Sequence, residues 1–378
     1  MTTVLTFFKK SSLWIWLAIA IVAIVVAPLL LSGFRLGLLA KYICLAMVAV
    51  GVGLAWGQGG MLTLGQGLFF GLGGYLMAMH LKLADAGPGG VPDFMSLYGN
   101  GELPAWWEPF RSPIATLILI LVIPAAVAFL LGWAVFARRV RGAYFAILSQ
   151  ALVAAFSLWL VNQGTSTGGF NGITDFKGFF GYSLKDPANK RLLYFIAAAV
   201  LIGMVLITRQ IMRSRFGELL IAVRDQENRV RFLGYNPAMI KTLTYTIAAV
   251  FAAIGGALFV PIVGIISPKD VGVTPSIIFL AGVVIGGRTT LLGPVLGTIA
   301  LRLIETNLSE TYPGFWTYFQ GALFILVIAF LPQGVATVGP WVKGLVDRYR
   351  YRRTRTPAPT RELPESTDTP QLVGRASS

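Results

Sequence analysis

The sequence predicts an all-α polytopic membrane protein with about ten membrane segments, some of them short or broken. Of its 378 residues, 56% are hydrophobic and only 12% are charged, whereas a soluble domain carries about 25% charged residues. The mean hydropathy is +0.72. Apolar runs that approach the roughly 20 helical residues needed to cross a bilayer recur along the chain. These three observations define the fold class.

The first apolar run, 13–31, follows a basic start that contains Lys9 and Lys10. A cleaved signal peptide is the alternative interpretation, but its apolar region runs only about 7–15 residues and ends at a small-residue cleavage site. The run in this chain is longer and has no such site. We therefore expect a retained first span.

Seven further spans are predicted by the same length criterion. They cover 36–56, 61–83, 113–137, 142–162, 191–212, 242–264 and 315–331. The apolar stretch 276–304 differs, because each half is too short to cross a core of about 30 Å at 1.5 Å per residue. We expect two short helices broken around Gly286–Gly287–Arg288, or a re-entrant hairpin buried in protein.

Lysine and arginine in the loops set the expected orientation, because cytoplasmic loops are enriched in both. By this rule the two termini, the segment 137–142 and the segment 209–241 lie inside, whereas the loops 84–112 and 163–190 lie outside. The net charge of +15 has the same origin, so it does not indicate a nucleic-acid partner. We expect a transmembrane domain over 1–343 and a disordered basic cytoplasmic tail over 344–378.

The segment 209–234 is polar and lies between two apolar runs. Its apolar residues recur near the helical period from Phe216 onward, and Gly234 with Asn236–Pro237 forms a stop signal. We therefore expect a short amphipathic cytoplasmic helix. It could lie at the lipid surface or fit a groove on a cytoplasmic partner. The mixture of acids and arginines on its polar face favours the protein partner.

The phosphate-binding loop of nucleotide hydrolases, G-x-x-x-x-G-K-[ST], is missing from the sequence. His80 and Cys44 are the single histidine and cysteine, so no metal site and no cofactor site are predicted. The ionisable residues within the expected spans, Lys41, His80, Arg302 and Glu305, lie near segment ends, where snorkelling to the interface accounts for them.

Uncharged polar residues occur at membrane depth. Gln58, Thr63, Gln66 and Gln150 each have donors or acceptors that cost roughly 1–3 kcal/mol when buried without a partner. They must pair between helices or line a wet path, and both roles stay open. The glycine-rich stretch 51–80 around the first three is suited to close helix contact or to a break beside a cavity.

Five stretches carry a family resemblance. They are LTLGQGLFFGLGGYLMAM (62–79), RGAYFAILSQAL (141–152), TGGFNGI (167–173), GELLIAVRDQENRVRFLGYNPAMIKTLTYTIAAVFAAIGGAL (217–258) and GGRTTLLGPVLGT (286–298). Together they resemble the permease subunits of ATP-binding cassette importers for branched-chain amino acids and amides, from about residue 36 to 332. The outer loop with VPDF and ELPAWW, and TGGFNGITDFK, look most like the urea-transport permease.

The resemblance implies a multi-pass, non-catalytic permease of the bacterial inner membrane. Its expected partners are a second homologous permease subunit, two cytoplasmic ATPases, an external solute-binding protein and membrane lipid. The expected solute is urea or a short amide, which needs hydrogen-bonding groups rather than fixed charges. The alternatives are a branched-chain amino acid permease and, in another class, an ATP-independent carrier or channel.

The resemblance also assigns residues. The ATPase-coupling positions are Gly217, Glu218, Ala222, Arg224, Asp225 and Gly234. The positions near the substrate pathway are Gln58, Thr63, Gln66, Phe69, Tyr75, Tyr144, Gln150, Thr167, Gly168, Gly169 and Asn171.

Overall fold

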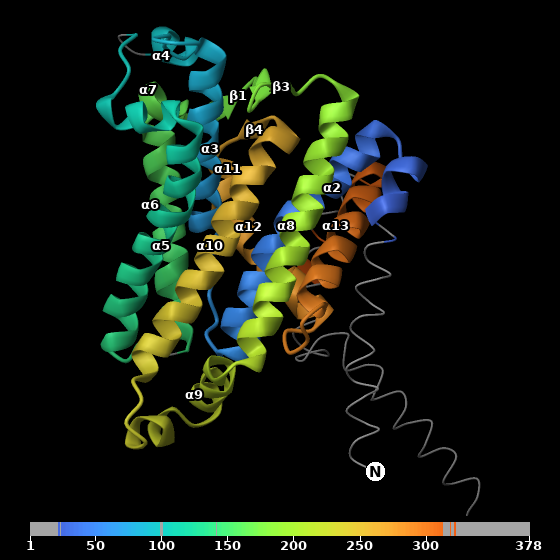
Figure 1. Ribbon diagram of the computed structural model, residues 1–378. Helices are drawn as coiled ribbons and strands as arrows, with labels where there is room; N and C mark the ends of the chain where they lie inside the picture. Colours follow the sequence, from blue (N-terminus) through green and yellow to red (C-terminus); the bar gives the residue numbers. More distant parts are fainter. Residues whose placement is uncertain are drawn as a thin grey trace, which may run out of the picture. The chain divides into compact units, whose positions relative to one another are not determined.

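The apolar runs of the sequence form long helices in the computed structural model of the chain (Figure 1). The structure describes residues 24–98, 101–140 and 142–312, and also the isolated positions 22, 318, 321 and 322. Most of the predicted span 13–31, almost all of 315–331 and the whole predicted tail 344–378 lie outside the described residues. Residues 24–30, at the end of the predicted first span, are helical.

Six helices of the described part are long and apolar enough to cross a membrane. They are α2 with its continuation η1 (Gly33–Val52 and Gly53–Gln58), α3 (Gln66–Ala86), α5 (Pro113–Ala137), α6 (Ala143–Asn162), α8 (Pro187–Arg213) and α10 (Pro237–Val263). Each one coincides with a predicted span. The prediction of an all-α polytopic membrane protein is therefore confirmed, with six full-length helices in the described part.

Local sequence explains where three of these helices begin. Ser112, Asp186 and Asn236 each accept a hydrogen bond from a backbone N–H of the first turn, and a proline follows each of them. A short polar cap before proline is a strong helix start, because it satisfies a free N–H and presets the backbone angle. By contrast, α3 begins at Gln66 rather than at the predicted residue 61, since 60–65 is not helical.

Helix α10 is central to the fold, since it packs extensively against α3, α5 and α2. Small residues allow this close approach. An added Cβ at Gly73 of α3 would collide with the backbone carbonyl of Ala253 in α10, and one at Gly256 would collide with that of Phe70. Helices α5 and α6 lie at the periphery and expose apolar side chains.

The stretch 276–304 forms the broken pair that its length predicts. Helix α12 (Val273–Gly286) and helix α13 (Gly293–Thr311) are joined by a turn at 287–292. The two helices pack through glycine, because an added Cβ at Gly286 would meet the carbonyl of Gly293 and one at Gly297 would meet that of Gly282. Helix α13 continues beyond the predicted boundary at 304, which changes the position of its charged residues.

Small elements lie at the end of the helices opposite α9 in Figure 1, in the two segments predicted as outer loops and in the connection that follows α10. They are α4 (Asp93–Tyr98), η2 (Ala105–Arg111), α7 (Gly164–Thr167), η3 (Gly169–Asn171), β1 (Ile173–Thr174), β2 (Gly178–Phe179), β3 (Tyr182–Ser183), β4 (Ile265–Ile266) and α11 (Pro268–Val271). Strand β1 pairs antiparallel with β4, and β2 with β3.

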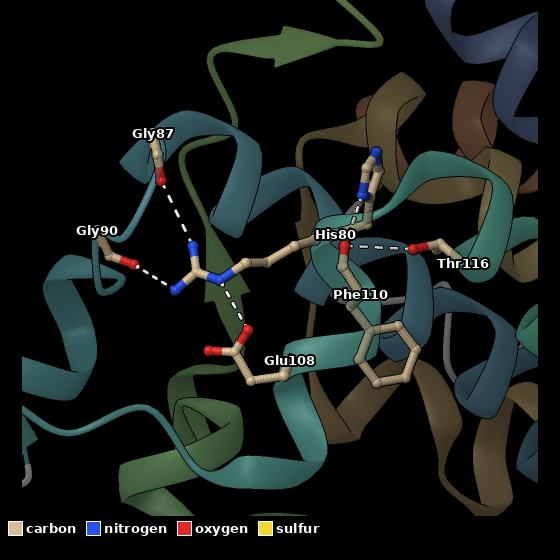
Figure 2. Close-up of polar contacts among 7 residues, drawn as sticks. His80, Gly87, Gly90, Glu108, Phe110 and Thr116 are labelled. Atoms are coloured by element: carbon tan, nitrogen blue, oxygen red, sulfur yellow. Dashed lines mark hydrogen bonds and ion pairs between the residues drawn. The ribbon is translucent and has the colours of Figure 1, made fainter.

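Hydrogen bonds hold the loop 84–112 against α3, as Figure 2 shows. The guanidinium of Arg111 donates to the carbonyl oxygens of Gly87 at 3.5 Å and Gly90 at 3.3 Å, and to the Glu108 carboxylate at 3.0 Å. The carbonyl of Phe110 lies 2.8 Å from Nδ1 of His80. This arrangement gives the buried histidine a structural role at the end of η2.

Candidate functional site

The amphipathic helix predicted in the segment 209–234 is present as α9 (Arg215–Phe232), between α8 and α10. It is kinked at Gln226, where φ is −146° and ψ is 62°. Its buried side chains Leu220, Val223 and Val230 form a cluster with Leu54 of η1 and Ile240 of α10. The apolar face is thus used within the chain, which leaves the polar face of α9 exposed.

Arg224 joins α9 to the end of η1. Its Nη1 donates to the Gly57 carbonyl at 3.0 Å, and its Nε donates to the Asp225 carboxylate at 2.8 Å. Gly60 makes room for the arginine stem, because an added Cβ there would lie 2.7 Å from Cγ of Arg224. The hydrogen bond from Arg224 holds the pKa of Asp225 below its ordinary value, so this exposed carboxylate is charged at neutral pH.

The opposite side of η1 contacts the turn between α12 and α13. Nε2 of Gln58 donates to the carbonyl of Thr289 at 3.2 Å, and the Arg288 guanidinium lies 4.9 Å from the ring centre of Trp56. An added Cβ at Gly57 would collide with the carbonyl of Arg288. The segment 56–60 thus contacts Arg224 on one side and residues 288–289 on the other. We call these two sets of contacts the coupling junction. It connects the polar helix to the broken helix pair through one short segment.

The other predicted coupling residues surround this junction in different ways. Gly217 is buried where α8 turns into α9, since an added Cβ would lie 2.5 Å from the carbonyl of Ile211. Ala222 packs against the apolar cluster, and Glu218 is exposed. Gly234 has a φ of +87° just after α9, a conformation that favours glycine and fits the predicted stop.

A second anchor of α9 was missed by the sequence reasoning. The carboxylate of Glu227 lies 2.8 Å from Nζ of Lys241 in α10 and 3.2 Å from the Arg231 guanidinium. The Glu227 and Lys241 side chains are only 15% and 14% exposed. Fourteen positions separate them in the sequence. No helical spacing rule links residues that lie on two different helices.

Helix α3 and the segment before it contact α12 and α6 beside two predicted pathway residues, Gln66 and Gln150. The N–H of Gly67, next to Gln66, donates to Ser276 at 3.2 Å, and the N–H of Leu64 donates to Ser149 at 3.2 Å. The side-chain amides of Gln66 and Gln150 and the hydroxyl of Tyr75 are buried and have no hydrogen-bond partner among the described residues. Such groups are costly unless a polar partner reaches them.

Other predicted pathway residues are placed differently. The hydroxyl of Thr63 accepts from the N–H of Gly65 at 3.3 Å. Phe69 is fully buried, with its ring 5.5 Å from that of Tyr245, which is the position of a core side chain. Tyr144 is 78% exposed on α6.

The TGGFNGI motif forms a tight structure rather than an open loop. Thr167 donates to the carbonyl of Gln163 at 2.9 Å, and Gly168 and Gly169 both have positive φ. An added Cβ at Gly172 would collide with the carbonyl of Ile266, beside the β1–β4 pair. The motif therefore fixes the end of α6 to the connection after α10. Asn171 is exposed at its surface.

The charged residues expected near segment ends require a correction. Arg302 and Glu305 were expected near a segment end, but α13 runs from Gly293 to Thr311 and places both within it. Nη1 of Arg302 lies 2.7 Å from the Glu305 carboxylate, and the arginine side chain is only 14% exposed. Lys41 lies within the continuous helix Gly33–Gln58. Arg302 and Glu305 thus lie inside α13 and pair with each other, whereas a position near a segment end was expected.

Fold and site together define a polytopic helical membrane protein in which a kinked amphipathic helix is connected to a broken helix pair. Residues 34–328 match the family described as branched-chain amino acid transport system, permease component, and the chain belongs to this family. The prediction of a non-catalytic permease component is thereby confirmed.

Curated relatives include the high-affinity branched-chain amino acid transport system permease proteins LivM and LivH. The chain is 29% identical to LivM of Salmonella typhimurium over 237 residues, which cover 57% of this chain and 55% of the relative. It is 30% identical to Escherichia coli LivM over 56% of this chain and 54% of the relative. It is 28% identical to E. coli LivH over 35% of this chain and 44% of the relative.

The chain thus spans about half the length of the curated relatives it matches. No solved structure matches it. The family is the one to which the quoted motifs pointed. Within it, the similarities favour the branched-chain amino acid alternative over the urea-transport permease.

Proposed function

We propose that this chain is a membrane-spanning permease subunit of an ATP-driven importer for branched-chain amino acids. The coupling junction carries the proposal, because a chain without a phosphate loop needs a mechanical connection to an ATPase. Arg224 supplies one inside the subunit, from the exposed helix α9 to η1 and on to the α12–α13 turn. A motion imposed on α9 is thereby transmitted to helices at membrane depth.

The proposed partners follow from this role. Two cytoplasmic cassette ATPases act on α9, a second homologous permease completes the pathway, and an external binding protein delivers the solute. Relatives named LivM and LivH are both permease proteins of high-affinity branched-chain amino acid transport systems, which supports a pair of permeases. We place the assembly in a bacterial inner membrane with both termini in the cytoplasm.

Urea is the competing solute, since the outer loop and TGGFNGITDFK favoured it. The family match and the named relatives support branched-chain amino acids instead. Uptake of radiolabelled leucine and of radiolabelled urea in a deletion strain distinguishes the two. We expect deletion to abolish uptake of leucine but not of urea, and the intact chain to restore it. Restoration of urea uptake alone would contradict the proposed substrate.

The energy source is tested separately, because an ion-driven carrier would also restore uptake. Right-side-out membrane vesicles are either loaded with ATP or given a proton gradient, and uptake of leucine is measured in each. Leucine uptake should require ATP and persist after the gradient is collapsed. Uptake that needs only the gradient would favour the carrier alternative.

A further inference from the structure

A polar cavity of about 260 Å³ lies between α2 and α13. Four charged residues line it, namely Lys41 from α2 and Arg302, Glu305 and Glu310 from α13. Two are cations and two are anions, so the cavity wall is balanced in charge. Ionisable residues within membrane helices are expensive to bury and commonly mark sites of function.

Lys41 is the cation that the fold leaves available. It lies eight residues after the first residue of α2, roughly 12 Å along the helix axis. Its Nζ lies 5.9 Å from the ring centre of Phe259. It has no hydrogen bond or ion pair to any residue that the structure describes. A cation in this position is suited to an anionic group that enters the cavity.

The opposite wall is already organised. Arg302 and Glu305 form an ion pair one helical turn apart, and the hydroxyls of Tyr42 and Thr306 are hydrogen-bonded across the two helices. Because Glu305 is paired with Arg302, Glu310 is the carboxylate with no ion-pair partner in the described part of the chain. The cavity thus presents one unpaired cation and one unpaired anion.

A second cavity of about 340 Å³ adjoins the first and shares Leu38 and Lys41 with it. Its walls include the apolar side chains of Phe34, Leu193 and Ile262, and a second lysine, Lys190. Lys41 therefore lies between the two cavities and can reach a ligand in either one. Small-molecule sites are typically apolar cavities of about 300–1,000 Å³ with a few well-placed polar groups.

We propose that the joined cavities are a binding site for a zwitterionic α-amino acid with an apolar side chain. The carboxylate binds Lys41, the ammonium binds Glu310, and the side chain occupies the cavity lined by Phe34, Leu193 and Ile262. This inference rests on the proposed function and extends it to a site within the permease itself. A single anionic lipid headgroup fits less well, because it would bind Lys41 and leave Glu310 without a cationic partner.

The proposal predicts which parts of the ligand each residue recognises. We use the full-length chain, purified with its accompanying subunits in phosphatidylcholine nanodiscs, and measure ligand binding by saturation-transfer NMR. The probes are leucine, leucinamide, which lacks the carboxylate, and isovalerate, which lacks the ammonium. Wild-type protein should prefer leucine over either analogue by about tenfold or more.

Two substitutions then separate the contacts. Lys41→Gln should reduce the preference for leucine over leucinamide to about twofold or less, while leucinamide still binds. Glu310→Gln should reduce the preference for leucine over isovalerate to about twofold or less. Lys41→Arg should retain the carboxylate preference. The matched control is Lys82→Gln, because Lys82 donates to the carbonyl of Asp175, outside the cavity. Retained leucinamide binding shows that Lys41→Gln is folded.

Three outcomes would overturn the proposal. One is a leucine preference that Lys41→Gln leaves unchanged, and another is a lack of leucine binding in wild-type protein. The third is loss of co-purifying anionic phospholipid in Lys41→Gln with no effect on leucine, which would make the cavity a lipid site. If leucine uptake in cells still depends on the chain in these cases, the proposed function stands and only the site is rejected.

Discussion

Nη1 of Arg224 donates to the backbone carbonyl of Gly57 at 3.0 Å, across 167 positions of sequence. One hydrogen bond thus joins the exposed helix α9 to the last turn of the span Gly33–Gln58, which is largely buried. The acceptor is a backbone atom, so only the donor can be removed by substitution. The following predictions begin from this contact.

Arg224→Ala should lower leucine uptake by about tenfold, because a charge-assisted hydrogen bond and the ion pair to Asp225 are both lost. Uptake in a deletion strain measures this effect, and the amount of protein in the membrane should stay unchanged. The matched control is Arg191→Ala, an exposed arginine at the other end of α8. Equal uptake by the two variants would show that Arg224 has no role in transport at the coupling junction.

Gly57→Ala should destabilise the protein by about 1–3 kcal/mol, because the new methyl group meets the carbonyl of Arg288 and the backbone must move. Thermal unfolding of the purified chain in detergent measures this. Gly203→Ala is the control, since nothing lies within 4 Å of a Cβ at that helical position. It should be neutral or slightly stabilising. A melting temperature of Gly57→Ala equal to that of wild type would show that the close contact is not present.

Lys241→Met should cost about 1–3 kcal/mol of stability, because it leaves the largely buried Glu227 carboxylate without its closest cation. The double variant Glu227→Gln with Lys241→Met should recover part of this loss. A double-mutant cycle of unfolding free energies measures the coupling between the two. A coupling energy near zero would mean that the pair contributes nothing to holding α9 against α10.

Arg111→Ala should loosen the loop 84–112, because two backbone carbonyls, those of Gly87 and Gly90, lose their donor (Figure 2). Faster hydrogen exchange in this loop, with no change in α9, is the expected result. Arg191→Ala serves again as a control, since it should leave exchange in the loop unchanged. Exchange that stays equally slow in Arg111→Ala would show that other contacts hold the loop.

Elements governed by local sequence were predictable. Helix α5 begins at Pro113 and ends at Ala137, as its apolar run predicts, and the break between α12 and α13 contains Gly287 and Arg288. Gly234 ends the amphipathic helix because its φ of +87° suits glycine. The kink at Gln226 could not be predicted, since neither proline nor glycine occupies that position.

Relations between distant residues were not predictable in this way. The contacts of Arg224 with Gly57 and of Glu227 with Lys241 depend on how helices pack, which periodicity does not report. The charged cavity was missed because the end of α13 was placed at 304, and Arg302 then looked peripheral. The loop motifs favoured a neutral solute, whereas the family match and the named relatives favour branched-chain amino acids.

The most direct test of the account is site-specific cross-linking from α9 in the assembled transporter. The buried Cys44 is the single cysteine, so Cys44→Ala gives a background in which new cysteines can be labelled one at a time. A photoreactive label at Glu218→Cys should capture a cassette ATPase, and the same label at Ser183→Cys in β3 should not. If no label at exposed positions of α9 ever captured an ATPase, the proposed role of this helix would be contradicted.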